Sequence, residues 1–223
     1  MTRRAFDVAK LVAVGLCVLI NPSLAPCAPT GAAGYSLVED SKSPCGRYGI
    51  MVPDYETFEK GQRARLVTIS NGDWIWEMKN ADHFKSMNHG YIRASWQQKD
   101  NESLCLVVCN NKWNPGSVAL LRVGPSPRTG NTNTLSVLEF DVWTPFVSES
   151  AKLLEGTKLV SLGTEVQFIG AGLIQLRAIA TKDPKHPNQA SDLVVVGIYD
   201  VKTHSIKMKP LTPVGAASRQ GDN

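Results

Sequence analysis

This sequence of 223 residues lacks the short motifs by which many enzyme families are recognised. It contains no GxSxG nucleophile elbow, no HExxH zinc motif, no phosphate-binding P-loop and no Rossmann fingerprint. The CxxxC spacing of Cys105 and Cys109 is a poor zinc signature without a second pair or a nearby histidine. We therefore expect no metal and no cofactor, and we favour a binding protein over an enzyme.

The chain also lacks a hydrophobic run long enough to cross a membrane. The apolar run from Leu11 to Ile20 has ten residues, whereas a transmembrane helix needs ~20. A basic start, TRR, precedes the run, and an Asn-Pro pair and small residues follow it, as in a cleaved secretory signal. Cleavage after Ala25 or after Cys27 fits, and we prefer the second. We predict a signal peptide over 1–27 and a secreted, extracellular protein with no membrane attachment after cleavage.

A strong charge of one sign is missing as well. The full chain has a formal net charge of +4, and residues 1–27 carry +2 of it, which leaves +2 on the other 196 residues. A nucleic-acid-binding protein usually shows a basic face or stripe, and "GQRAR" at 61–65 is only a short cluster. The charge balance therefore gives no support to nucleic-acid binding.

Cysteine is sparse, and Cys17 leaves with the predicted signal. Secretion favours disulfides, so that Cys27, Cys45, Cys105 and Cys109 are the candidates. Cys105 and Cys109 lie in a predicted strand, where four residues span ~13 Å, while bridged Cα atoms lie within ~7 Å. They should therefore not pair with each other, and each needs Cys45 or Cys27 as its partner. The cleavage site decides whether two bridges form or one thiol is left over.

One glycosylation sequon is present, Asn101-Glu102-Ser103. It lies in the polar turn "QKDNES" between two apolar runs, which is a place where a glycan would be tolerated. Asn101 is therefore a glycosylation candidate if the source is eukaryotic.

Most of the sequence consists of short runs that are typical of β-strands. Runs such as "RLVTI", "SLCLVVC", "TLSVLEFDVW" and "DLVVVGIYDV" are rich in β-branched and aromatic residues and are bounded by Gly, Pro, Asn and Asp. Their spacing predicts an all-β, mainly antiparallel, single-domain sandwich or barrel with one or two short helices. The best helix candidate is 148–156, with Ser148 as its cap. We expect a flexible arm over 28–44, a globular domain over 45–214 and a disordered tail over 215–223.

Tryptophans are the main candidates for a binding surface. In "DWIWEMK", Trp74 and Trp76 fall on one face of a strand because strand side chains alternate. Facing outwards, they would form a flat platform for a sugar ring, a base or a partner protein; facing inwards, they would belong to the core, which we favour. Trp96 and Trp113 offer a second pair of rings for the same purpose.

Two groups of residues could support hydrolysis. Glu139 and Asp141 share a strand face with side chains ~7 Å apart, a separation used by glycosidases. His83 and His89 flank a short turn and could act as general acid and base, as in a secreted ribonuclease. A half-exposed strand and a polar loop explain these two patterns better, so that a hydrolase stays an alternative and we assign no catalytic residue.

The layout of the whole chain resembles the small secreted effectors of plant-colonising fungi of the smut kind. The shared features are the signal over 1–27, a single cysteine-poor domain and no enzyme signature. The resemblance implies secretion into host tissue and interference with a host protein, and it assigns no functional residue.

Three hypotheses follow from these observations. The first is a secreted, non-enzymatic protein that binds a host or other extracellular protein, as a virulence effector does. The second is a carbohydrate-binding module that uses the surface tryptophans. The third is a secreted hydrolase of the ribonuclease or glycosidase type.

Overall fold

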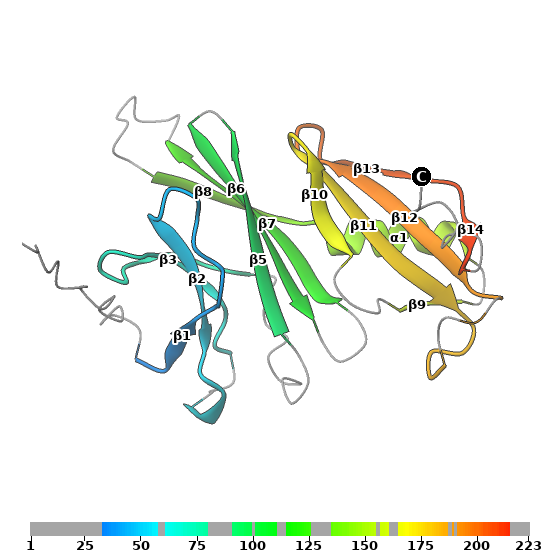
Figure 1. The fold of residues 1–223 in the computed structure, drawn as a ribbon, viewed down its shortest axis with the longest axis horizontal. Helices are drawn as coiled ribbons and strands as arrows, with labels where there is room; N and C mark the ends of the chain where they lie inside the picture. The colour runs from blue at the N-terminus through cyan, green and yellow to red at the C-terminus, as the bar shows by residue number, and fades with distance from the viewer. Residues whose placement is uncertain are drawn as a thin grey trace, which may run out of the picture.

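The computed structural model describes residues 33–57, 61–79, 91–99, 101–110, 115–125, 135–154, 157–160, 165–186, 189 and 191–214. Antiparallel strands dominate these residues, which confirms the predicted all-β fold class. Figure 1 shows the sheets in chain order, from the blue N-terminal sheet through the green middle sheet to the yellow and orange C-terminal sheet. The predicted signal over 1–27 and the predicted tail over 215–223 lie outside the described residues.

Each sheet is formed mainly by strands that follow one another along the chain. The first sheet pairs β1 (Tyr35–Leu37), β2 (Tyr48–Pro53), β3 (Arg65–Thr68) and β4 (Trp74–Glu77) in that order. The middle sheet pairs β5 (Tyr91–Lys99), β6 (Glu102–Asn110), β7 (Pro115–Pro125) and β8 (Leu135–Asp141). The third sheet contains β9 (Lys158–Val160), β10 (Val166–Gly170), β11 (Leu173–Thr181), β12 (Leu193–Asp200), β13 (Ser205–Met208) and β14 (Thr212–Pro213).

The middle sheet has a hydrophobic core on each of its faces. Every side chain of β6 from Ser103 to Asn110 is buried, and successive side chains point to opposite faces of a strand. Leu104, Leu106 and Val108 join a core with β10, β11, β12 and the helix, whereas Cys105, Val107 and Cys109 join a core with β2 and β3. The continuous apolar run "SLCLVVC" is therefore the pattern of a strand that is covered on both sides.

Two polar side chains of β5 join the middle sheet to the third one. The amide of Gln97 donates a hydrogen bond to the carbonyl oxygen of Gly170 and accepts one from the amide of Gly172, both at 2.9 Å. Arg93 donates to the carbonyl oxygen of Val166 at 3.4 Å. Gly172 lies in the turn between β10 and β11 with φ of +74°, a conformation that favours glycine. These bonds fix the β10–β11 hairpin against β5.

The helix α1 (Trp143–Leu153) begins five residues before the start predicted from Ser148. The carboxylate of Asp141 accepts hydrogen bonds from the backbone amides of Trp143 and Thr144 at 2.9 and 3.0 Å, so that it satisfies two of the amides that a helix start leaves unpaired. Pro145 lies in the first turn, where its missing N–H costs nothing. A short 3-10 helix, η1 (Tyr55–Thr57), follows β2.

Part of the predicted N-terminal arm belongs to the folded sheet. β1 pairs with β2 through Tyr35 opposite Pro53, inside the range 28–44 that we expected to be flexible. The hydroxyl of Ser41, which is buried, donates to the carbonyl oxygen of Ile50, and the hydroxyl of Ser43 accepts a bond from the amide of Tyr48. These serines follow a strand of only three residues, which is too short for its alternation to predict a strand or the burial of the serines after it.

The structure contains no disulfide among Cys45, Cys105 and Cys109, contrary to the predicted bridges among them. Cys105 and Cys109 are buried on one face of β6, while Cys45 is exposed in the turn before β2, and Cys27 lies outside the described residues. Burial by itself would raise the pKa of the Cys45 thiol, but hydrogen bonds with Arg47 and Ser43 outweigh it and lower the pKa to about 7. Burial raises the pKa of Cys105 well above its usual value.

Candidate functional site

A β-bulge separates the two tryptophans of β4. Leu66 pairs with Trp76 and Val67 pairs with Trp74, so that Ile75 is the extra residue on β4. An extra residue reverses the alternation of side chains along a strand. Trp76 consequently packs with Leu66 against the inner core, and Trp74 lies on the outer face with Val67. The shared platform considered as an alternative is therefore not formed, and the core position that we favoured for both rings applies to Trp76 but not to Trp74.

A hydrogen bond to a carboxylate holds the half-buried ring of Trp76 in place. Its indole Nε1 donates a hydrogen bond to the Glu139 carboxylate at 2.8 Å, and the same oxygen, Oε2, accepts the backbone amide of Lys79 at 2.8 Å. The bond links β4 of the first sheet to β8 of the middle sheet. Trp76 is therefore part of the structure that joins two sheets.

The exposed ring of Trp74 makes a cation–π contact with Arg65. Trp74 is 52% exposed, and the guanidinium carbon of Arg65 lies 3.1 Å from the centroid of its ring. The same guanidinium lies 3.9 Å from the centroid of the Tyr35 ring. Glu77 accepts hydrogen bonds from Arg65 at 3.2 and 3.3 Å. We call Tyr35, Arg65, Trp74 and Glu77 the Trp74 cluster.

The electrostatics of the Trp74 cluster favour a single arrangement. The side chain of Arg65 is 14% exposed, so that its cation–π contacts are partly desolvated, and such contacts contribute ~1–2 kcal/mol. Burial raises the pKa of the Tyr35 phenol above its usual value, although the charge of Arg65 opposes the shift. The phenol therefore stays neutral at physiological pH, and Glu77 balances the one cation.

The remaining predicted binding and modification residues are dispersed. Trp96 is half-buried, stacks at 6.4 Å from Tyr48 and donates its Nε1–H to the carbonyl oxygen of Ser41 at 2.8 Å. Trp113 lies outside the described residues. Asn101 is exposed in the turn between β5 and β6, as expected for a glycan acceptor. Trp96 packs against the core, whereas Trp74 is exposed on the outer face of the first sheet, so the two rings do not form one binding surface.

The residues considered for hydrolysis have structural partners or lie outside the described residues. Glu139 binds Trp76 and the amide of Lys79, and Asp141 caps α1. His83 and His89 fall in a part of the chain that the structure does not describe. Within the described ranges, no group of three or more His, Cys, Asp or Glu side chains is placed to hold a metal ion.

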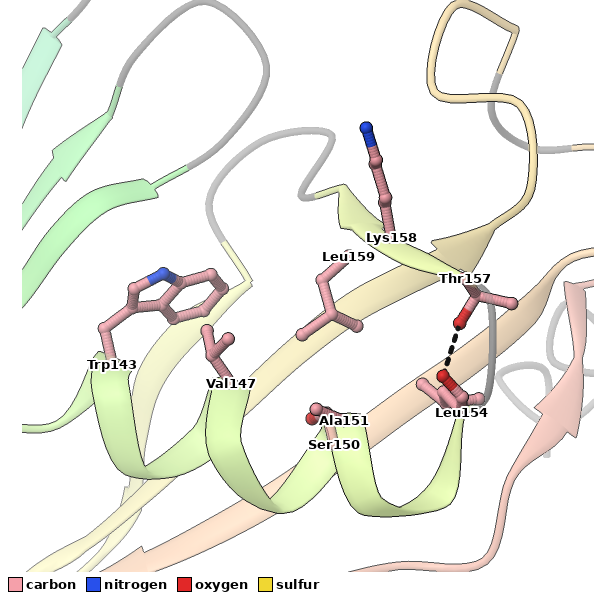
Figure 2. A pocket seen from close by; sticks show the side chains of 8 residues that line it. All are labelled: Trp143, Val147, Ser150, Ala151, Leu154, Thr157, Lys158 and Leu159. Atoms are coloured by element: carbon pink, nitrogen blue, oxygen red, sulfur yellow. Dashed lines mark hydrogen bonds between the residues drawn. The ribbon is translucent and has the colours of Figure 1, made fainter.

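A cavity of about 380 Å³ lies between α1 and β9. Figure 2 shows the residues that line it, which are Trp143, Val147, Ser150, Ala151, Leu154, Thr157, Lys158 and Leu159. The hydroxyl of Ser150 donates to the carbonyl oxygen of Phe146 at 2.7 Å, and that of Thr157 donates to Leu154 at 3.4 Å. Sequence reasoning missed this cavity because it did not place the helix start at Trp143.

Sequence reasoning also missed Arg65 and Tyr35. In the sequence Arg65 belongs to the short basic stretch "GQRAR", and Tyr35 lies in the range 28–44 that composition predicts to be a flexible arm. Alternation along β3 places Arg65 and Val67 on one face, and this was a readable signal. The pairing of β1 with β2 was not readable from a three-residue strand.

The comparisons with known proteins identify no relative. No protein-family model matches the chain, and neither a curated protein sequence nor a solved structure shows significant similarity to it. Among the helices that the structure describes, none has the length and hydrophobicity required to cross a membrane.

Proposed function

We propose that this protein binds another protein and that the Trp74 cluster is the centre of its binding surface. The observation that carries the proposal is the exposed Trp74 ring held by the Arg65 guanidinium at 3.1 Å. Trp, Tyr and Arg are the residues most enriched among those that dominate the free energy of protein association. The cluster brings one of each together on the outer face of the first sheet.

The arrangement supports tight binding because it is ordered before a partner arrives. Arg65 contacts two rings and one carboxylate, so its long side chain has little freedom to lose. Immobilising a flexible side chain on association costs ~0.5–1.5 kcal/mol, and prior ordering removes that cost. Trp74 in turn presents its outer ring face to solvent in a fixed orientation.

The two alternative functions receive less support from the residues that suggested them. A carbohydrate-binding module would use two coplanar exposed rings, but Trp76 and Trp96 are half-buried and hydrogen-bonded through Nε1. A glycosidase would need Glu139 and Asp141 at a substrate, but both carboxylates bind backbone amides. A single exposed tryptophan with an arginine behind it suits a protein partner better.

Secretion and the identity of the partner are part of the proposal on sequence grounds. The signal predicted over 1–27 supports secretion of the mature chain, and the layout of the chain resembles that of fungal effectors. We therefore propose an extracellular or host protein as the partner, bound in a role such as that of a virulence effector.

The test starts from capture and ends with a measured affinity. The mature chain from Ala28 onward is incubated with extract of the tissue or medium into which it is secreted, retained proteins are identified, and one is purified for calorimetry. Trp74→Ala should weaken its binding at least about tenfold, since central tryptophans contribute ~2 kcal/mol or more. Leu138→Ala removes an equally exposed side chain from β8 and should leave the affinity unchanged.

Two results would contradict the proposal. One is a purified partner that binds the Trp74→Ala variant and the wild type equally well, with both proteins folded by circular dichroism. The other is retention on polysaccharide with no protein partner, which would move the assignment to a glycan-binding function.

A further inference from the structure

We propose that the cavity between α1 and β9 binds a small amphipathic molecule, with its apolar tail inside the cavity and its carboxylate beside Lys158. The site uses none of the residues of the Trp74 cluster and goes beyond the proposed function. Its volume of about 380 Å³ falls within the ~300–1,000 Å³ typical of small-molecule sites.

The helix presents a second apolar stripe, which touches the core only through the partly buried Trp143. Phe146 is fully buried and packs into the core between the middle and third sheets. Trp143, Val147 and Ala151 follow one another at intervals of four residues, so they share a different face of α1, and all three line the cavity. Val147 remains 37% exposed there. An apolar stripe along an open cavity is the feature that a ligand tail would cover.

The side-chain hydroxyls of the cavity wall already have hydrogen-bond partners within the protein. The hydroxyl of Ser150 donates to the carbonyl oxygen of Phe146 in the helix, and that of Thr157 donates to the carbonyl oxygen of Leu154, directly after the helix. The rest of the lining is Trp, Val, Ala and Leu, apart from Lys158. Because unsatisfied polar groups are costly to bury, this wall selects a hydrocarbon tail over a polar one.

Lys158 sets the charge of the other end of the ligand. In Figure 2 the Leu159 side chain points towards the helix, whereas the Lys158 side chain extends from the other side of β9, away from the helix, in keeping with alternation along the strand. Lys158 is exposed and has no ion-pair partner in the described part of the chain, while the nearby Lys152 is paired with Glu149 at 2.6 Å. Lys158 is the one charged residue among those that line the cavity, so it favours an anionic head group outside the apolar wall.

The experiment compares three ligands of ten carbon atoms each, below their micelle or solubility limits. Decanoate, decanol and decylammonium are titrated into the mature protein by calorimetry. Decanoate should bind saturably with one site, decanol more weakly, and decylammonium most weakly. Equal binding of decanoate and decylammonium would overturn the role of Lys158, and no saturable binding of decanoate would overturn the site.

Matched variants assign the binding to this cavity. Lys158→Gln should weaken decanoate about three- to fivefold, the effect of a solvent-exposed ion pair, and should leave decanol unchanged. Lys152→Gln, which removes a cation already paired with Glu149, should change neither. Ala151→Phe fills the cavity from an exposed helix position and should abolish binding while the protein stays folded. Undiminished binding to a folded Ala151→Phe protein would place the ligand elsewhere.

Discussion

The ring of Phe146 lies directly against Gly197 of β12. A Cβ atom added at position 197 would lie 2.8 Å from Cδ2 of Phe146 and 2.9 Å from Cδ1 of Ile206. Both values are shorter than ordinary carbon contacts, and Phe146 is fully buried, so that its ring has no space to move into. The absence of a side chain at position 197 is therefore what allows α1 to approach the third sheet closely.

Gly197→Ala should destabilise the protein by ~1–3 kcal/mol, the usual result of adding a carbon to a filled core. Urea denaturation measures the loss as a lower midpoint at an unchanged slope. Gly170→Ala is the matched control, because its Cβ would meet only Leu173 at 3.9 Å. Equal stability of the two variants would show that the contact with Phe146 does not limit the packing.

Gln97→Ala should loosen the contact between the middle and third sheets. It removes a donor to the Gly170 carbonyl and an acceptor for the Gly172 amide, and unpaired, partly buried groups cost ~1–3 kcal/mol. Hydrogen exchange should speed up at the amide of Gly172 before it does so elsewhere. Ser95→Ala is the control, because it changes an exposed residue on the same face of β5 and should leave the exchange rates unchanged. Faster exchange in the Ser95→Ala variant would mean that any change in β5, and not the loss of the Gln97 side-chain amide, causes the effect.

The two tryptophans of β4 should respond differently to the same substitution. Trp76→Phe removes the Nε1 donor to Glu139 and should cost ~1–3 kcal/mol of stability, as bonds to charged groups do. Trp74→Phe keeps a ring on Arg65 and should cost less than ~1 kcal/mol. Thermal unfolding of both variants measures the difference. The reverse order would mean that Trp74, not Trp76, is the structural residue.

Alkylation of Cys45 should follow the titration of an acidic thiol. Because the thiolate is the reactive species, the rate with iodoacetamide should rise with pH and reach half its maximum at about pH 7. Arg47→Ala removes the hydrogen bond at 3.5 Å and should move the midpoint towards the ordinary value of ~8.5. Mass spectrometry of the Cys45 peptide gives the rate. Cys105 and Cys109, which are buried, should stay unmodified without denaturant, and their labelling at the same rate would contradict the structure.

The strands can be predicted from the sequence because the residues that favour a strand occur in short continuous runs. "SLCLVVC" predicted a strand, and β6 occupies that position. The run "TLSVLEFDVW" was predicted as one strand, but β8 ends at Asp141 and α1 begins at Trp143. The helix start depends on the Asp141 side chain accepting two backbone amides, and the strand-like residues before it conceal that role.

The candidate site could not be read from the sequence for a different reason. Alternation predicts that Trp74 and Trp76 share a face, and it fails because β3 and β4 pair with a shift between Leu66 and Val67. That shift is a property of the pairing between β3 and β4, so it cannot be predicted from the sequence of either strand by itself. The contact of Arg65 with Tyr35 likewise requires knowing that β1 and β3 both flank β2.

The position of the middle sheet between two cores has a consequence for synthesis. Chains emerge from the ribosome N-terminus first, so the sheets of residues 35–77 and 91–141 are complete before the third sheet exists. Until β10, β11 and β12 are made, Leu104, Leu106 and Val108 have no covering layer. The unfinished chain therefore carries an apolar sheet face, and we expect a fragment truncated near residue 141 to aggregate.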